Sequence, residues 1–443
     1  MKRNLLFIFF CFSLLFKLSA QGNFVLQKGK EDKISFKLIN NLIVIPVEIN
    51  GVELSFLLDT GVTKPIIFNF LNLTEELKIN QTELIYIRGL GEGEPMEALR
   101  SRNNVVKIGD AINVDQDLFA VFDPSLNFAP RLGVPIHGII GYDFLKDFVV
   151  EVNYSRNFLK IIPPNKYSEK DCKKCSSFDL EFHHNKPYMM GEVTINGNKT
   201  PVKLLIDSGG SDALWLFEDK ENNITVPEKF FVDFLGQGLS GSVYGKRSVI
   251  DKVSFSDFDL KRVNVAFPDS TSISYAKKIK DRNGSLSGEI LKRFNVVLNY
   301  PKKKISLKKN NNYGKPFMYN KSGITLEHSG VRVVKEQNNV QKLESGMDNS
   351  NRNEARVVIS TSYKFSLAPA FTVVELRENS PAKRAGLEIG DVVLAINNKS
   401  THLFSLQEVI QFFYEEDGKR LKLLVERKGV KKVIFFRLES LLK

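Results

Sequence analysis

Two regions of the chain share one order of strand-forming runs and turns. Each has two such runs joined by an Asn-Gly pair, at Asn50-Gly51 and at Asn196-Gly197. The flanking runs lie at 44–49, 52–58, 190–195 and 202–206. Asn-Gly between β-rich runs is a strong hairpin signal, because both residues tolerate positive φ. Both regions are therefore predicted to form a β-hairpin.

The correspondence continues after the hairpins. Each second run leads into Asp-(Thr/Ser)-Gly, beginning at Asp59 and Asp207, and a glycine-rich segment starts 30 and 29 positions later. Gly141 and Gly288 follow the same two aspartates by 82 and 81 positions. Each half then closes on a β-rich run, at 148–154 and 294–300. Spacings that agree within one residue indicate a tandem duplication.

The C-terminal part has a different pattern. A strand is predicted at 323–334, a hydrophilic insert at 335–355 is predicted to be a mobile loop, and another strand starts at Phe371. Ser405-Leu406-Gln407-Glu408 has the form of a capping box, which begins a helix. In that helix one apolar face is predicted, made of Leu406, Val409, Ile410 and Phe413.

Length and composition favour several globular domains. The chain has 443 residues, of which 42% are apolar and 26% charged, and compact domains usually have about 100 to 200 residues. We predict a signal peptide (1–20), a first lobe (21–163), a linker (164–177), a second lobe (178–309) and a C-terminal domain (315–443).

The first twenty residues have the features of an export signal. Lys2 and Arg3 precede an apolar run at 5–16, and small residues follow up to Ala20. The run is too short to span a bilayer comfortably. Cleavage is expected after Ala20, and Cys11 is misplaced for a lipid anchor. The mature protein is expected to be exported, periplasmic or secreted, without a transmembrane segment.

Charge and cysteine content argue against several functions. The formal charge of +12 becomes +9 without the three basic residues of the leader. The lysines are scattered among acids and no basic-aromatic motif occurs, so nucleic acid is not an expected partner. Cys172 and Cys175 lack a second ligand pair for zinc, and their polar context differs from that of a redox motif. A structural disulfide and idle thiols both remain open.

The repeated aspartates carry the candidate chemistry. Two carboxylates about 3 Å apart cannot both ionise easily, so the pair shares a proton and titrates as a unit. The charged member can deprotonate water while the protonated member polarises a peptide carbonyl. No metal and no cofactor are required. Asp59 and Asp207 are the candidate catalytic pair.

Leu-Leu-Asp-Thr-Gly at 57–61 and Leu-Ile-Asp-Ser-Gly at 205–209 resemble the active-site loops of pepsin-like and retroviral aspartic proteases. The resemblance covers about 34–309. It implies a mainly β fold, with two pseudo-symmetric retropepsin-like β-barrel lobes that form one cleft. Each lobe is shorter than a pepsin lobe, which fits a compact, retropepsin-like form fused in one chain.

The same resemblance implies roles for the neighbours of the aspartates. The hydroxyls of Thr60 and Ser208 are expected to bond across to the opposite loop, with a local turn bond as the alternative. Gly61 and Gly209 are expected to let the backbone approach the carboxylates. Mobile flaps are implied at the glycine-rich tips, with ordinary surface hairpins as the alternative; their residues are Gly89, Gly91, Gly93, Gly236, Gly238 and Tyr244.

A supporting element is expected behind each catalytic loop. Ile139, Ile140 and Gly141 resemble the two apolar residues and glycine that thread behind the loop in this family. In the second half Ser287 replaces an apolar residue before Gly288, which departs from the pattern.

Residues 371–397 resemble bacterial PDZ domains through Ser-Pro-Ala at 380–382, Ala-Gly-Leu at 385–387 and Gly-Asp at 390–391. The resemblance implies an α+β domain in which the strand from Phe371 and the capped helix flank a groove. An extended peptide would add there as a strand, with its terminal carboxylate held by the preceding loop at 367–370. The implied groove residues, of which at least half have core packing as the alternative, are Leu367, Ala368, Phe371, Val373, Val409 and Phe413.

Two functions of different class fit these observations. The first is an exported aspartic endopeptidase whose PDZ-like domain recruits peptide or protein substrates, including protein C-termini. The alternative is a non-catalytic peptide-binding or scaffold protein that retains the fold. Retention of both aspartates favours catalysis, because a binder needs neither carboxylate. Ser-His-Asp chemistry has little support, since none of the five histidines lies in a Gly-x-Ser-x-Gly context.

Overall fold

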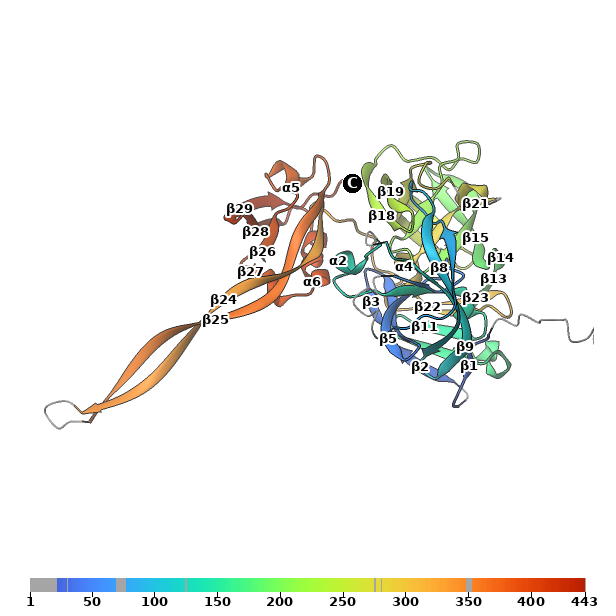
Figure 1. The fold of residues 1–443 in the computed structure, drawn as a ribbon. Helices are drawn as coiled ribbons and strands as arrows, with labels where there is room; N and C mark the ends of the chain where they lie inside the picture. Colours follow the sequence, from blue (N-terminus) through green and yellow to red (C-terminus); the bar gives the residue numbers. More distant parts are fainter. Residues whose placement is uncertain are drawn as a thin grey trace, which may run out of the picture. The chain divides into compact units, whose positions relative to one another are not determined.

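The computed structural model describes residues 22–442 except 30, 69–76, 124–125, 275, 280 and 348–352, and the side chains of 171 and 336–361 are also not described. The predicted signal peptide lies outside the described residues. The fold is mainly β (Figure 1). It divides into two compact units: the first comprises the chain up to Asn127 and Ile136–Phe317, and the second comprises Phe128–Pro135 and Met318–Lys443.

The first half of the duplication forms one sheet, in which β3 (Lys37–Ile39) also pairs with β4. The strand order is β1 (Val25–Leu26), β9 (Ala111–Ala120), β6 (Ile66–Ile67), β10 (Gly138–Ile140), β5 (Val52–Leu58), β4 (Leu42–Ile49), β8 (Met96–Ile108) and β7 (Thr82–Ile87). The predicted hairpin is formed by β4 and β5, which pair up to Ile49 and Val52.

The second half forms a corresponding sheet. Its strand order is β14 (Glu181–His183), β15 (Lys186–Ile195), β16 (Asn198–Asp207), β21 (Arg282–Ser287), β17 (Leu214–Leu216), β20 (Phe258–Pro268), β19 (Gly241–Phe255) and β18 (Phe231–Gly238). The predicted hairpin is formed by β15 and β16. All four turn residues of the two hairpins have positive φ, as Asn-Gly turns allow: Asn50, Gly51, Asn196 and Gly197.

A third sheet joins the two halves. Its order is β13 (Ser176–Asp179), β23 (Lys304–Lys309), β22 (Phe294–Asn299), β11 (Val149–Asn153), β12 (Phe158–Ile162) and β2 (Asp32–Ser35). The closing runs of the two repeats, β11 and β22, pair with each other antiparallel. One hydrophobic core includes buried residues of both halves, such as Phe56 and Ile206. The duplication therefore folds as a single unit.

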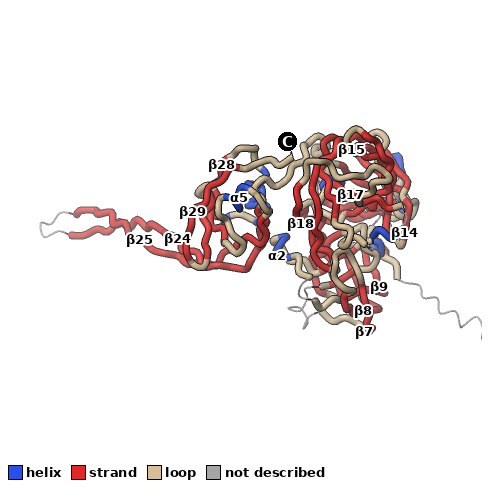
Figure 2. Tube along the Cα trace, turned by 90° about the horizontal axis from the view of Figure 1, so that it is seen from above, coloured by secondary structure: helices blue, strands red, loops and turns tan. Residues whose placement is uncertain are grey.

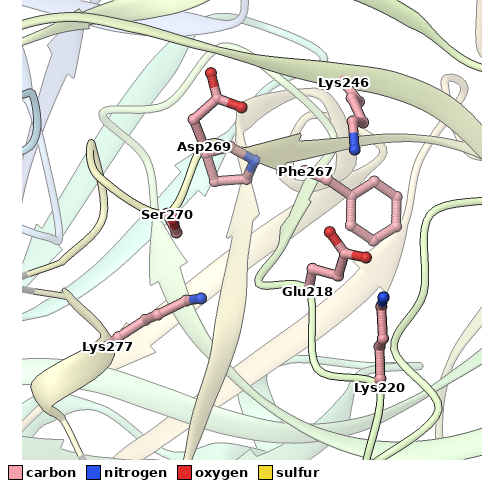
Figure 3. A pocket seen from close by; sticks show the side chains of 8 residues that line it. Glu218, Lys220, Lys246, Phe267, Asp269, Ser270 and Lys277 are labelled. Atoms are coloured by element: carbon pink, nitrogen blue, oxygen red, sulfur yellow. The ribbon is translucent and has the colours of Figure 1, made fainter.

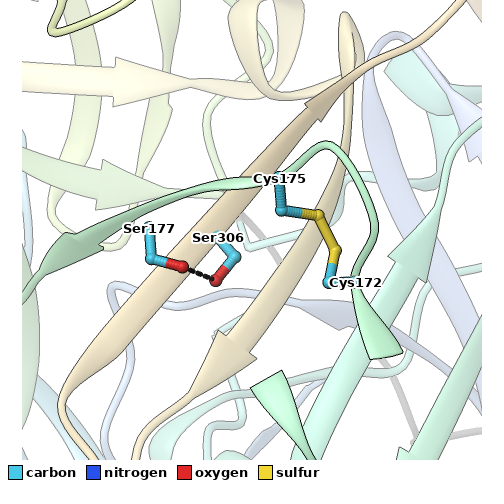
Figure 4. The surroundings of a disulfide bond; sticks show 4 residues. All are labelled: Cys172, Cys175, Ser177 and Ser306. Carbon is cyan, nitrogen blue, oxygen red and sulfur yellow. Dashed lines mark hydrogen bonds between the residues drawn. A yellow bond between two sulfur atoms is a disulfide. The ribbon is translucent and has the colours of Figure 1, made fainter. Parts of the chain in front are cut away.

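The predicted linker contains two short 3-10 helices, Pro164–Lys166 and Glu169–Asp171. They are followed by a disulfide between Cys172 and Cys175 (Figure 4). Beside it Ser177 and Ser306 share a hydrogen bond of 2.7 Å between β13 and β23. Of the two possibilities that the sequence left open, the structure has the disulfide.

The second unit contains a sheet of β24 (Ile324–Met347), β25 (Asn353–Leu376), β26 (Val392–Ile396), β28 (Arg420–Arg427) and β29 (Val430–Arg437), with β27 (Lys399–Ser400) beside β26. Its helices are α2 (Ala129–Leu132), α5 (Pro381–Arg384) and α6 (Leu406–Gln411), and two 3-10 helices lie at Thr401–Leu403 and Phe412–Tyr414. The capping box of Ser405 and Glu408 is confirmed at the start of α6.

For the described residues of 335–355, the prediction of a loop was wrong, because they lie in β24 and β25. β24 and β25 pair continuously from Val331 and Pro369 to Met347 and Asn353, as a long hairpin (Figures 1 and 2). Hydrophilic composition alone does not decide between a loop and a strand. The β-branched run Val357-Val358-Ile359 was the available signal for a strand.

Candidate active site

The two aspartates stand at equivalent positions in the two sheets. Asp59 directly follows β5, and Asp207 is the last residue of β16. A parallel strand lies beside each: β10 beside β5, and β21 beside β16. The Asp59 N–H donates to the Ile140 carbonyl at 2.8 Å. Because β5 and β16 each have a neighbouring strand on both sides, their ends are rigidly placed.

Four hydrogen bonds link the two aspartate loops across the repeat. The Thr60 hydroxyl donates to the Ile206 carbonyl at 2.6 Å and accepts from the Ser208 N–H at 3.0 Å. Reciprocally, the Ser208 hydroxyl donates to the Leu58 carbonyl at 2.7 Å and accepts from the Thr60 N–H at 3.0 Å. Thr60 and Ser208 are both buried. Each hydroxyl is thus used fully, and neither makes merely a local turn bond.

The glycines after the aspartates leave room for the carboxylates. The Gly61 N–H donates to Asp59 Oδ1 at 2.7 Å, and the Gly209 N–H donates to Asp207 Oδ1 at 3.1 Å. A Cβ on Gly209 would lie 2.3 Å from Asp59 Oδ2. A Cβ on Gly61 would lie 3.0 Å from Asp59 Oδ1 and 3.6 Å from Asp207 Oδ1. Both carboxylates therefore reach the same small region.

The supporting elements pack tightly behind both loops. A Cβ on Gly141 would lie 2.1 Å from the Asp59 carbonyl oxygen, and one on Gly288 would lie 2.8 Å from the Gly210 carbonyl oxygen. Short helices follow, α3 (Tyr142–Leu145) and α4 (Gly288–Leu291). Ser287 is buried and still pairs with Asp207, so the serine does not loosen the support of the second loop.

Burial and mutual repulsion make the pair weakly acidic. Burial, together with the charge of Asp207, raises the pKa of Asp59 to about 7, while the Gly61 N–H and Lys186 oppose the shift. Burial also raises the pKa of Asp207, against the stabilising charges of Arg282 and Lys186. A pair with this behaviour keeps one shared proton into the neutral range.

Lys186 and Arg282 are neighbours of the pair that the sequence did not reveal. Lys186 begins β15 and Arg282 begins β21, on either side of β16. The Arg282 Nη2 donates to Ser285 Oγ at 2.9 Å, and its guanidinium lies 5.2 Å from the centre of the Phe217 ring. Burial lowers the pKa of both cations. Only the pairing of three strands brings them near the aspartates, so no local sequence signal could identify them.

The glycine-rich tips of the two halves contact each other. The Gly93 N–H donates to the Ser240 carbonyl at 2.7 Å, and the Ser240 N–H donates to the Leu90 carbonyl at 2.9 Å. The Gly89 N–H donates to Ser240 Oγ at 3.1 Å. Gly91 lies at the same contact with φ of 118°, and a Cβ there would lie 2.4 Å from the Ser240 carbonyl carbon. Two hairpin tips thus close on one another.

Two predicted flap residues lie away from this contact. Gly236 sits at a register shift within β18, where a Cβ would meet nothing within 4 Å. Tyr244 lies in β19 opposite Phe234 of β18, and the centres of the two rings are 5.5 Å apart. Its side chain is exposed. Tyr244 is therefore within the β18–β19 hairpin and not at its tip.

A polar cavity of about 380 Å³ lies in the second half at the end of β20 (Figure 3). Its lining comprises Glu218, Lys220, Lys246, Phe267, Pro268, Asp269, Ser270 and Lys277. Neither catalytic candidate lines it, so this cavity is separate from the aspartate pair.

The predicted peptide groove of the second unit needs correction. Four of its residues are core residues, at most 1% exposed: Phe371, Val373, Val409 and Phe413. Leu367 and Ala368 lie within β25, paired with Val333 and Arg332, and not in a loop. Because β25 has β24 on one side and β26 on the other, it offers no free edge for strand addition. The edge strands of the described sheet are β24 and β29, and β24 is the one that α6 contacts.

The comparisons with known proteins agree with this architecture. The family model of aspartyl proteases matches residues 45–144, and the PDZ domain model matches residues 372–427. The chain therefore has an aspartyl protease domain and a PDZ domain. No curated protein matches the chain. The first match ends before Asp207, so the second half is assigned by the internal repeat and the geometry above. None of the helices in the described part of the chain is long and apolar enough to cross a membrane.

Proposed function

We propose that the protein is an exported aspartic endopeptidase with Asp59 and Asp207 as its catalytic pair. The observation that carries the proposal is the reciprocal set of four bonds between the aspartate loops, which holds both carboxylates in one place. A peptide-binding scaffold would need neither the lock nor two carboxylates with raised pKa.

The chemistry follows from one shared proton. A water between the carboxylates loses a proton to the charged aspartate and attacks the peptide carbonyl, which the protonated aspartate polarises. Arg282 favours the charged form of Asp207 and is not among the groups that act on Asp59, whereas Lys186 acts on both, so the protonated form is favoured at Asp59. The proton taken from water is then available for the leaving amine.

Access and recruitment complete the proposal. A polypeptide can reach the pair when the bonded tips around Gly93 and Ser240 separate, which is the role of a flap. The PDZ domain holds peptide segments of substrate proteins. Export to the periplasm or the medium rests on the leader at 1–20 alone.

The test is the loss of turnover in Asp59→Asn and Asp207→Asn. Each should lower kcat/KM on a peptide library by at least about 10³-fold, because the shared-proton pair acts as a unit. Asp259→Asn is the matched control, since Asp259 is 51% exposed and pairs with Lys252 at the surface. Circular dichroism checks the fold of each variant.

Two results would reject the proposal. Residual turnover near the wild-type level in a folded Asp59→Asn or Asp207→Asn variant would exclude the pair as catalytic. Absence of turnover in the wild type, with peptide binding retained, would favour the scaffold function. Cleaved peptides from a proteome treated with the wild type, absent from the Asp59→Asn sample, would identify the substrates.

A further inference from the structure

A segment of the same chain packs on the edge strand β24 of the PDZ sheet. The segment Phe128–Pro135 comes from the first half of the sequence but belongs to the second compact unit. Its helix α2 packs on the edge strand β24, and α6 packs on β24 as well. The Gln407 side chain of α6 donates to the Leu132 carbonyl at 2.6 Å. The segment thus contacts both β24 and α6.

The occupant is held by charge and by shape. Arg131 pairs with Glu327 of β24 at 2.8 Å and with Glu375 of β25 at 3.1 Å. All three side chains are less than 30% exposed, which limits screening of the pairs by solvent. Gly133 ends α2 with φ of 66°, and a Cβ there would lie 3.0 Å from Leu406 Cβ. A side chain at this position would push the segment away from α6.

In the loop that leads into β24, the N–H groups of residues 321–324 already have acceptors within the domain. The Asn320 Oδ1 accepts from the N–H groups of Ser322 and Gly323, at 2.9 and 3.1 Å. The Ile324 N–H donates to Ser322 Oγ, and the Lys321 N–H donates to the Phe413 carbonyl. Four consecutive N–H groups are thereby used within the domain. Capture of a C-terminus requires such groups to be free.

We propose that the groove between β24 and α6 binds internal, arginine-bearing segments rather than C-termini, and that Phe128–Pro135 is its resident ligand. An external segment must displace this ligand, which competes at the high effective concentration of a tethered group. A competing segment needs a cation where Arg131 lies, because Glu327 and Glu375 would otherwise lose their ion pairs with Arg131. The proposal concerns binding and holds whether or not the chain cleaves peptides.

The experiment measures binding of a labelled peptide to the full chain. The probe is a fluorescein-labelled, C-terminally amidated peptide with the sequence of residues 127–135, Asn-Phe-Ala-Pro-Arg-Leu-Gly-Val-Pro. All proteins carry Asp59→Asn, so that the probe stays intact. Adding Arg131→Glu or Gly133→Val should tighten binding at least about tenfold, by weakening the tethered competitor. These two variants act through charge and through bulk, so one misfolded variant leaves the other as the test.

Matched variants locate the effect in the groove. Arg102→Glu makes the same charge change at the surface pair with Glu83 and should leave binding unchanged. Glu327→Arg, added to Gly133→Val, should abolish binding of the probe and restore it for a probe with Glu in place of its arginine. A probe with a free C-terminal carboxylate should bind like the amide, within about threefold.

Two outcomes would overturn the proposal. If every folded variant with the altered segment binds the probe no tighter than the parent chain, or fails to bind it, the segment is not a ligand of the groove. If the free carboxylate improves affinity by about tenfold or more, the domain captures C-termini instead.

Discussion

Asp59 and Asp207 are equivalent in the repeat but differ in the cations around them. Arg282 is the largest favourable charge at Asp207, and Lys186 acts on both aspartates. Each cation begins a strand beside β16. At the scale of single residues, the second half therefore supplies both the second carboxylate and the charges that tune the pair.

Lys186 is expected to affect the pH range of activity. Activity requires one proton on the pair, and its alkaline limb should lie near pH 7, where Asp59 loses its proton. A cation favours the charged carboxylates, so removing it in Lys186→Met should raise the pKa of the pair and move the limb to higher pH. The measurement is kcat/KM against pH. Lys199→Met, at an exposed lysine paired with Glu192, should leave the limb in place; an unshifted limb in Lys186→Met would refute the coupling.

A second prediction concerns stability. The pKa of Asp59 is raised on folding from 3.8 to about 7, so its burial costs stability above pH 4, and the full cost is present above pH 7. Asp59→Asn, which cannot ionise, should therefore be more stable than the wild type at pH 8 by roughly 2 to 4 kcal/mol, and nearly equal at pH 4. Chemical denaturation at both pH values measures this difference.

The control for this prediction has the opposite sign. A hydrogen bond from Ser254 lowers the pKa of Asp259, so Asp259→Asn should lose a little stability at pH 8 and none below its folded pKa. Equal stability of Asp59→Asn and the wild type at pH 8 would show that Asp59 is not perturbed by burial.

At the scale of elements, the hairpins meet at glycines that the contact requires. Gly238 ends β18, and a Cβ there would lie 2.1 Å from the Leu90 carbonyl oxygen of the opposite tip. Gly236, two residues earlier in the same strand, has open space at the Cβ position. Alanine at Gly238 would disturb the contact between the tips, whereas alanine at Gly236 adds the same methyl group without doing so.

Gly238→Ala should lower kcat/KM by about tenfold, because the tips can no longer close over a bound peptide and exclude water. Gly236→Ala should be close to wild type. Steady-state kinetics on one peptide substrate measures both. Equal activities of the two variants would show that closure of the tips does not contribute to turnover.

At the scale of the whole molecule, the protease unit extends to Phe317, beyond the predicted end at 309. The reason is Arg293, which is 1% exposed. Its guanidinium donates to the carbonyls of Asn312, Tyr313, Lys315 and Pro316 and lies 3.5 Å from the centre of the Phe317 ring. Removal of these acceptors would leave a buried charge with few partners, which is among the costliest changes in a protein interior.

A chain that ends at Lys309 should therefore be less stable than one that ends at Phe317 by about 3 to 5 kcal/mol. The longer chain should cleave short peptides as the full protein does and lose activity mainly on protein substrates, because the PDZ domain is absent. Unfolding curves and parallel assays on both substrate types measure this. An equal loss on both types would show that the PDZ domain is part of the catalytic body.

Features that short segments encode could be predicted from the sequence. Asn-Gly turns, the capping box at Ser405 and the two Asp-(Thr/Ser)-Gly loops depend on local backbone preferences, which neighbours in the chain specify. The duplication was also visible, because equal spacing needs no knowledge of contacts. The predicted peptide groove, in contrast, was misplaced onto Phe371 and Val373, which are buried in the core.

Long-range contacts set which strands form the edges of the PDZ sheet, which cations lie near the aspartates, and where Phe128–Pro135 packs. Each of these depends on pairing between residues far apart in sequence, and such pairing is selected by the summed burial of whole strands. A polar stretch such as 335–355 can be a loop or a strand by composition, and its partner strand decides between them. Features encoded by neighbouring residues can therefore be predicted from the sequence, whereas features encoded by contacts between distant residues cannot.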